Sequence, residues 1–397
     1  MADVYQQSVD LHRKLGGKLA VQSLVTVTNQ QELSLAYTPG VAEPCRVIAK
    51  DPGASFDLTW RGRTVAVISD GSSVLGLGNI GPEAALPVME GKALLLKEFG
   101  GVDAVPLVIN TQDPSAIITF VKQVAPSFAG INLEDIAAPA CFEVEEGLQE
   151  IGIPVFHDDQ HGTAIVVTAA LRNAAQVVGK DYRHLKVVIV GAGAAGLAVG
   201  KMLLGLDCKS SSCRKLPHVD RVADVVLVDS QGAVHRDRSD LNLYKMAFAL
   251  ASNTDHQQGG LAEVVKGADV IIGVSRPGLI TPDMIKSMAA QPIVFALANP
   301  VPEIMPDEAQ AAGAAIVATG RSDFPNQINN VLAFPGIFRA VIKGRLPQVT
   351  TEMKLAAAEA LSKLVIDPDA DNIIPKPFTK DLAEKVSQAI LKTNSYV

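Results

Sequence analysis

A glycine-rich stretch in the middle of the chain, KVVIVGAGAAGLAVGKMLL, constrains the fold more than any other feature. Its apolar run predicts a buried strand, and the residues after the glycines predict a helix. Gly191, Gly193 and Gly196 stand between them with the spacing G-x-G-x-x-G. Such glycines allow a tight turn, a close approach of a pyrophosphate and close helix–strand packing. The stretch therefore predicts a dinucleotide site that includes Ala194 and Ala195; a glycine-rich junction without a ligand is the alternative.

The next apolar run, VVLVD, ends in Asp229, which is placed to accept hydrogen bonds from the adenosine ribose. The spacing exceeds the usual ~20 residues, and a Cys-Lys-Ser-rich insertion before Val219 accounts for the excess. Because a carboxylate repels a 2′-phosphate, Asp229 favours NAD over NADP. Arg236 and Arg238 follow closely and could offset this repulsion, so NADP stays open.

Two acidic pairs, Glu134-Asp135 and Asp158-Asp159, each follow a short apolar run. The two runs predict strands, and residues 139–150 between them predict a helix opened by proline. A strand–helix–strand unit of this length is right-handed with parallel strands, which places both pairs at one carboxyl edge. Four carboxylates gathered there repel one another unless a cation sits among them, and oxygen ligands favour Mg²⁺ or Mn²⁺. Two solvated loop tips with capping aspartates are the alternative.

The pattern of apolar runs predicts an α/β protein with two parallel sheets. Strands of the first sheet are expected at residues 65–68, 104–109, 128–133 and 153–156. Strands of the second are expected at residues 187–190, 225–228, 270–272, 293–296 and 315–318. We expect a substrate and metal domain over residues 1–162 and a Rossmann-type dinucleotide-binding domain over 163–345. C-terminal helices over 346–397 are expected to pack back on the first domain.

Several single residues are candidates for proton transfer or substrate binding. Lys92 lies in a largely apolar helix, where a buried lysine must find a carboxylate or lose its proton; a lysine with a lowered pKa suits a general base. Tyr37, on an irregular loop, could serve as a general acid. Asn299 and Asn330 follow strands and could donate to a substrate carboxylate. Each has a simpler reading, as a surface lysine, a packed tyrosine or a turn asparagine.

His157 and His161 flank the second acidic pair and could be ligands, although roles behind the ligands or at the surface fit equally. A second match to the glycine template, Gly76-Leu-Gly78-Asn-Ile-Gly81, stands well beyond its strand and lacks an acidic residue at the end of the next strand. We interpret it as a loop that approaches substrate or cofactor.

The composition of the chain indicates which kinds of partner and which cell compartment to expect. A net charge of −7 argues against nucleic acid or an anionic membrane. The chain shows neither a signal region nor a long apolar run, which predicts a cytoplasmic protein. The four cysteines are scattered without a CxxC, so free thiols are expected. Cys208 and Cys213, around a flexible insertion at 210–213, could pair or hold a metal.

Several separate stretches together resemble the malic enzymes, specifically the short bacterial and archaeal type. The resemblance runs from about residue 34 to residue 339 and is carried by AYTPGVAEPC, SDGSSVLGLGNIGP, PVMEGKALLL, NLEDI, FHDDQHGTA, GAGAAG, LANPVPE and GRSDFPNQINNVLAFPGIF. It implies oxidative decarboxylation of L-malate to pyruvate and CO₂ with reduction of NAD or NADP.

The resemblance also implies roles for residues. Glu134, Asp135 and Asp159 would ligate Mn²⁺ or Mg²⁺. Lys92 would be the base, supported by Asp158, and Tyr37 the acid. Asn299, which also belongs to the cofactor site, and Asn330 would hold the malate. Larger members carry an arginine where this chain has Ser73, so another cation or the loop amides must bind that carboxylate.

Two other functions remain open. A metal-dependent oxaloacetate decarboxylase would need the same carboxylates, whereas a non-catalytic dinucleotide sensor would need no metal. A homodimer is expected, in which the Tyr37 loop could reach the site of the partner.

Overall fold

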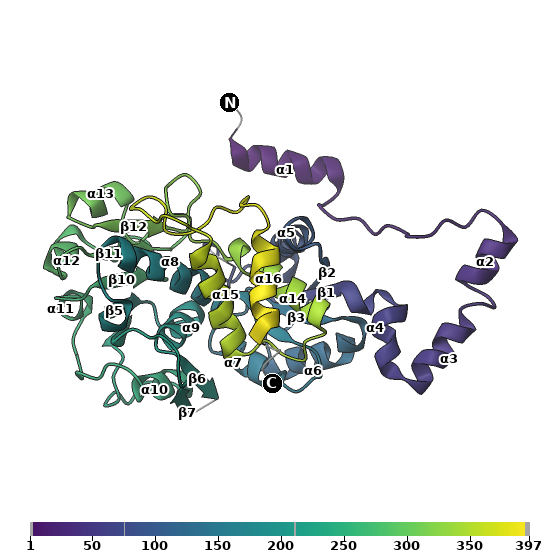
Figure 1. Ribbon diagram of the computed structural model, residues 1–397, viewed down its shortest axis with the longest axis horizontal. Coiled ribbons are helices and arrows are strands. Elements are labelled where there is room, and N and C mark those ends of the chain that lie inside the picture. The colour runs from purple at the N-terminus through teal and green to yellow at the C-terminus, as the bar shows by residue number, and fades with distance from the viewer. Residues whose placement is uncertain (1–2, 75, 210–211, 394–397) are drawn as a thin grey trace.

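The structure, a computed structural model, describes residues 3–74, 76–209 and 212–393 and contains two parallel sheets joined by helices (Figure 1). The predicted α/β class is thereby confirmed. Within the described residues, no helix is long and apolar enough to cross a membrane.

The first sheet has the strand order β2-β1-β3-β4, and all its pairs are parallel. Its strands are β1 (Thr64–Ser69), β2 (Asp103–Val108), β3 (Gly130–Leu133) and β4 (Val155–His157). Each strand lies within two residues of its predicted position. The central strands β1 and β3 are buried along their whole length, because helices cover both faces of a parallel sheet.

The second sheet has the strand order β12-β11-β10-β5-β8-β9. Its strands are β5 (Lys186–Val190), β8 (Asp224–Asp229), β9 (Gly232–Ala233), β10 (Val270–Gly273), β11 (Ile293–Ala296) and β12 (Ile316–Thr319). The five predicted strands are confirmed. The short β9, which was not predicted, pairs antiparallel with β8 at the sheet edge.

Helices connect the parallel strands of each sheet, whereas a turn joins β8 to β9. Those of the first part are α5 (Pro82–Gly100), α6 (Pro114–Val124) and α7 (Ala140–Gly147). Those of the second part are α9 (Ala194–Leu203), α10 (Leu243–Ala249), α11 (Leu261–Val264), α12 (Pro282–Ser287) and α13 (Pro306–Ala311). The π-helical turn η4 (Asp158–Gly162) and the buried helix α8 (Thr163–Val177) join the two sheets. Domain limits at residues 162 and 345 stay predictions.

Three helices follow the second sheet: α14 (Phe334–Gly344), α15 (Thr351–Lys363) and α16 (Leu382–Thr393). The helices α14 and α16 pack on each other and reach α5 of the first sheet. Arg339 of α14 donates to the carbonyl oxygen of Gly100 at 2.9 Å and to Glu384 at 2.6 Å. The chain thus returns from the second sheet to the helix that precedes β2.

The N-terminal segment forms an arm, which we define as residues 3–54. It carries α1 (Val4–Leu15), α2 (Gln30–Ala36) and α3 (Ala42–Lys50), followed by α4 (Ser55–Leu58). No residue of the arm is buried, and α2 and α3 project from the sheets (Figure 1). Many apolar side chains of the arm face solvent, among them Tyr5, Val21 and Leu35. Such a surface marks an interaction site.

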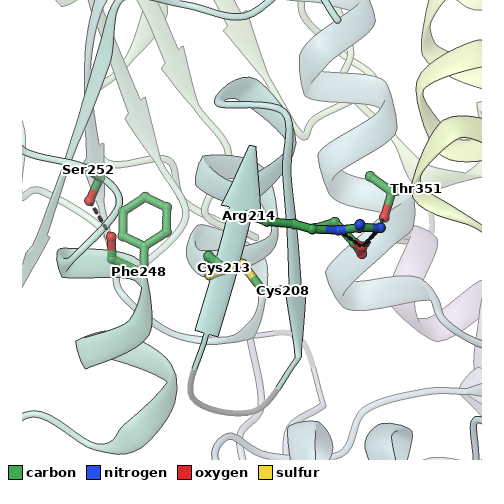
Figure 2. The surroundings of a disulfide bond; sticks show 7 residues. Cys208, Cys213, Arg214, Phe248, Ser252 and Thr351 are labelled. Carbon is green, nitrogen blue, oxygen red and sulfur yellow. Dashed lines mark hydrogen bonds and ion pairs between the residues drawn. A yellow bond between two sulfur atoms is a disulfide. The ribbon is translucent and has the colours of Figure 1, made fainter. Parts of the chain in front are cut away.

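The expectation of four free thiols is wrong for two of them. Cys208 and Cys213 form a disulfide bond across the hairpin of β6 (Leu206–Lys209) and β7 (Ser212–Lys215), as Figure 2 shows. The strand register places the two residues directly opposite each other. Pairing of Cys208 with Cys213 was one of the alternatives that the sequence left open, and it is the one that the structure shows. Residues 210–211 of the insertion expected to be flexible lie outside the described residues; Cys45 and Cys141 are free.

Asn173 offers a test of how α8 is fixed to the C-terminal segment. Its buried amide donates to the carbonyl oxygens of Ser362 and Ile373 at 3.0 and 2.9 Å. Replacement by alanine leaves buried acceptors without this donor, so we expect Asn173→Ala to lower the free energy of unfolding by about 1–3 kcal/mol. Urea denaturation measures this. The exposed Gln176→Ala on the same helix is the control, and equal midpoints for the two variants would contradict the assignment.

Candidate active site

The carboxyl edge of the first sheet brings the two acidic pairs together. Glu134 and Asp135 follow β3, while Asp158 and Asp159 follow β4 and open η4. The strands are neighbours, with Leu133 opposite His157, so the residues that follow them emerge side by side. The predicted placement of both pairs at one edge is confirmed.

Lys92 of α5 reaches into this cluster. Its ammonium lies 2.6 Å from Asp158 Oδ2, 2.8 Å from Glu134 Oε1 and 4.4 Å from the centre of the Phe334 ring. Burial alone lowers the pKa of Lys92, but the charges of Asp158 and Glu134 outweigh burial and raise it above its ordinary value. Of the two outcomes open to a buried lysine, Lys92 therefore found carboxylates.

Glu134, Asp135 and Asp159 offer three oxygen atoms that lie within 4.8 Å of one another. Burial, followed by repulsion from Asp159, raises the pKa of Asp135 to about 7. Burial likewise raises the pKa of Glu134 well above its ordinary value. Asp135 Oδ2 is buried without a hydrogen-bond partner. Crowded hard donors with an unsatisfied oxygen fit Mg²⁺ or Mn²⁺.

The asparagines come from the second sheet. Asn330, at the start of the turn η6 (Asn330–Leu332), donates to Asp158 Oδ2 at 3.1 Å and accepts from Thr163 at 3.1 Å. Asn299 follows β11 and packs against Gly76 and Gly320, where an added Cβ would collide with it. The second glycine match thus lies against the Asn299 loop, and the Ser73 amide donates to Asp135 O at 2.9 Å.

Tyr37 is the one predicted catalytic residue that the structure does not bring to the cluster within one chain. It ends α2 on the arm, and its side chain is 66% exposed. Lys18 of the arm donates to Glu90 and to the carbonyl oxygen of Pro87 on α5, the helix that carries Lys92.

The predicted dinucleotide turn lies between β5 and α9. Gly191 has a φ of +114°, and a Cβ on Gly196 would overlap the carbonyl oxygen of Gly191. Helix α9 begins at Ala194, followed by Ala195, with Gly193 as its N-cap. Free amides at a helix N-terminus suit a pyrophosphate.

Asp229 ends β8, as predicted, but it is occupied by cations. Arg238 contacts both its oxygens, at 2.8 and 3.2 Å, and Lys245 contacts it at 2.6 Å. Burial opposes ionisation, yet these hydrogen bonds lower the pKa of Asp229 to about 2. Arg236 is exposed. The charge that would repel a 2′-phosphate is therefore compensated.

Two buried polar residues escaped sequence reasoning. Asn132 on β3 donates to Glu134 Oε2 at 2.8 Å and so orients a candidate ligand. Glu303 is fully buried and accepts from the amides of Ser275 and Ala298, at 2.8 and 3.0 Å, which ties together the loops after β10 and β11. The stretch NPVPE offered a signal, because its acidic residue closes a proline-flanked loop.

The histidines lie behind the cluster. His157 is buried with Nδ1 at 3.6 Å from Asp159 Oδ2. His161 contacts Glu145 at 2.6 Å through Nε2 and Lys354 at 3.1 Å through Nδ1. Burial lowers the pKa of His161 to about 4, so a neutral ring donates to Glu145 and accepts from Lys354. Neither histidine belongs to the group of three carboxylates described above.

Fold and site define a class: a two-sheet α/β oxidoreductase in which a dinucleotide turn accompanies carboxylates suited to a divalent ion. The chain matches the family models "Malic enzyme, N-terminal domain" over residues 16–149 and "Malic enzyme, NAD binding domain" over residues 160–394. The chain therefore belongs to the malic enzyme family.

Characterised relatives agree with this assignment. The chain is 52% identical to the bifunctional malic/malolactic enzyme of Bacillus subtilis, over 98% of this chain and 92% of that one. It is 45% identical to the NADP-dependent malic enzyme of Halomonas elongata, over 97% and 92%. The crystal structure of the NAD-dependent malic enzyme from Thermotoga maritima superposes with a TM-score of 0.91 at 45% identity, over 97% and 98%.

The carboxylate cluster predicts metal binding that is measurable without turnover. We expect Asp135→Asn and Asp159→Asn each to weaken Mn²⁺ binding at least about tenfold, because a charged ligand is lost. Titration of free Mn²⁺ by electron paramagnetic resonance measures the affinity. Asp367→Asn, at an exposed carboxylate, is the control. Unchanged affinity in both cluster variants would show that the ion binds elsewhere.

Proposed function

We propose that the protein catalyses the oxidative decarboxylation of L-malate to pyruvate and CO₂ with reduction of NAD or NADP. One observation carries the proposal: Lys92 is held between Glu134 and Asp158 beside three oxygens suited to a divalent ion. Oxidation of a 2-hydroxy acid needs a base for the hydroxyl proton, and a Lewis acid at the C2 oxygen assists the decarboxylation that follows. The names of the relatives support the same reaction.

The residues divide the chemistry as follows. With the negative charge around it offset by a bound divalent ion, Lys92 would release its own proton and could then accept that of the C2 hydroxyl, directly or through Asp158. Bound NAD or NADP would supply the acceptor of the hydride from C2. The C3–C4 bond then breaks, C4 leaves as CO₂, and Tyr37 protonates C3 to give pyruvate. A divalent ion held by Glu134, Asp135 and Asp159 would withdraw electrons from the C2 oxygen and offset the negative charge around Lys92.

Substrate orientation falls to amides from the second sheet. The Asn330 amide donates to both the carbonyl oxygen and the carboxylate of Asp158, so donation to a malate carboxylate would replace one of these hydrogen bonds. Asn299 supplies a second amide at the end of β11. Ser73 cannot provide the charge of an arginine, so loop amides contribute to carboxylate binding.

The coenzyme preference follows from Asp229. A free carboxylate there would favour NAD, but Arg238 and Lys245 compensate its charge. We therefore propose that the protein can use NADP as well as NAD. Relatives named for each coenzyme occur at 45% identity.

The arm supports a homodimer in which each chain completes the site of its partner. The apolar side chains of the arm are exposed, and Tyr37 does not contact the carboxylate cluster of the same chain. Exchange of arms would bury these side chains and bring the phenol to the second site. A cytoplasmic location stays a prediction.

A steady-state assay with malate tests the reaction. We expect NADH or NADPH and pyruvate to form in equal amounts with Mn²⁺, and both to disappear with chelator. Lys92→Ala should lower kcat by about 10²–10⁴-fold, as expected for loss of a general base. Release of CO₂ from oxaloacetate without malate oxidation would instead support a decarboxylase. Binding of coenzyme without any turnover would support a sensor, and lactate in place of pyruvate a malolactic reaction.

Mixing two inactive variants tests the exchange of arms. Tyr37→Phe removes the acid from one chain and Lys92→Ala the base from the other, so a mixed dimer holds one intact site. After unfolding and refolding an equal mixture, we expect about a quarter of the wild-type activity. Each variant refolded alone is the control. If every Tyr37 served its own chain, the mixture would recover no activity.

A further inference from the structure

A cavity of about 850 Å³ lies on the far side of η4 from the carboxylate cluster. Gln160 and His161 line it, whereas Asp158 and Asp159 of the same turn do not. Its walls come from α7, α9, the β6–β7 hairpin and the N-terminal end of α15, which meet in the lower centre of Figure 1. Asp207 of the hairpin accepts from Thr351 of α15 and from Arg214 of the same hairpin. Figure 2 shows the Arg214 side chain reaching toward Thr351.

Two lysines, Lys201 and Lys354, line the inner part of this cavity. Glu145 is committed to His161, which in turn accepts from Lys354. Lys201 of α9 also lines the cavity and forms no ion pair among the described residues. The charges of Glu145 and Glu146 act to raise the pKa of Lys201, and those of Glu145, Asp207 and Glu352 act to raise the pKa of Lys354.

The nearby carboxylates do not fully offset the burial of the Lys201 and Lys354 ammonium groups. Burial is the main cause that lowers the pKa of Lys201 and of Lys354, and the positive charge of Lys201 lowers that of Lys354 further. A half-buried cation without a partner is unfavourable, and an anion in the adjacent space would relieve it.

The neighbouring wall is apolar and aromatic. The rings of Phe142 and Tyr244 lie 4.6 Å apart, and the ammonium of Lys201 lies 5.8 Å from the centre of the Phe142 ring. Met202 and Leu206 continue this wall. Glu146 and Glu150 at the same cavity disfavour a ligand with many negative charges.

We propose that this cavity is a second ligand site, which binds a small organic anion with one carboxylate or phosphate group and a planar or apolar body. The anionic group pairs with Lys201 and Lys354, and the body lies against Phe142 and Tyr244. The volume suits a small molecule. The site is separate from the proposed reaction and does not depend on it.

Acylation of lysines tests binding without measuring turnover. The full chain, saturated with Mn²⁺ and NAD, is treated with acetic anhydride in the presence of benzoate or phenyl phosphate. Mass spectrometry reads the rate at each lysine. We expect at least one of the two anions to slow acylation of Lys201 threefold or more, while the exposed Lys376 is unchanged. Benzyl alcohol, a neutral molecule of similar shape, should slow neither.

Variants then separate binding from general effects on folding. The effective anion should raise the unfolding temperature of the wild type and of Lys201→Arg, but not that of Lys201→Met. Lys376→Met is the matched control and should behave as the wild type. The proposal is overturned if neither anion slows acylation of Lys201, if Lys376 is slowed equally, or if Lys201→Met keeps the temperature shift. These readouts stay valid even if malate is not the substrate.

Discussion

Repulsion among buried carboxylates organises the centre of this molecule. Glu134, Asp135 and Asp158 are almost fully buried at one sheet edge, and Asp159 joins them. Isolated charges would not persist there, because each loses its hydration. Lys92 supplies one compensating charge, and the raised pKa of Asp135 and Glu134 shows that one is insufficient. A further cation at this site would therefore stabilise the ionised carboxylates.

Residues that are distant in the sequence meet at this carboxylate cluster. The acidic pairs come from adjacent strands of the first sheet, whereas Asn330 arrives from beyond the second sheet and donates to Asp158. Lys92 comes from α5, on which the C-terminal helices pack. The chain therefore crosses to the second sheet and then returns to the first. The returning segment places the Asn330 amide against the Asp158 carboxylate and packs on the helix that carries Lys92.

Regular patterns made most of the fold predictable. Apolar runs located nine strands, and the parallel topology forced the acidic pairs to one edge, so the cluster followed from residues 131–163 alone. Features that depend on distant contacts did not follow. The pKa of Lys92 needed both of its partners, Asp158 and Glu134. Likewise, nothing local indicated that Lys354 would contact His161. Position along the chain also gave no sign that Tyr37 lies outside its own cluster.

The turn η4 has a consequence for how such sequences can vary. Its π-helical spacing, in which the Thr163 amide donates to Asp158 O, turns two aspartates to one side and Gln160 and His161 to the other. Gly162 is required as well, since a Cβ would overlap Asp158. Removing one residue would rotate the following side chains by about 100° and present the wrong groups to each side. We therefore expect this segment to tolerate substitution better than insertion or deletion, because a change in length by even one residue would turn its side chains away from both faces.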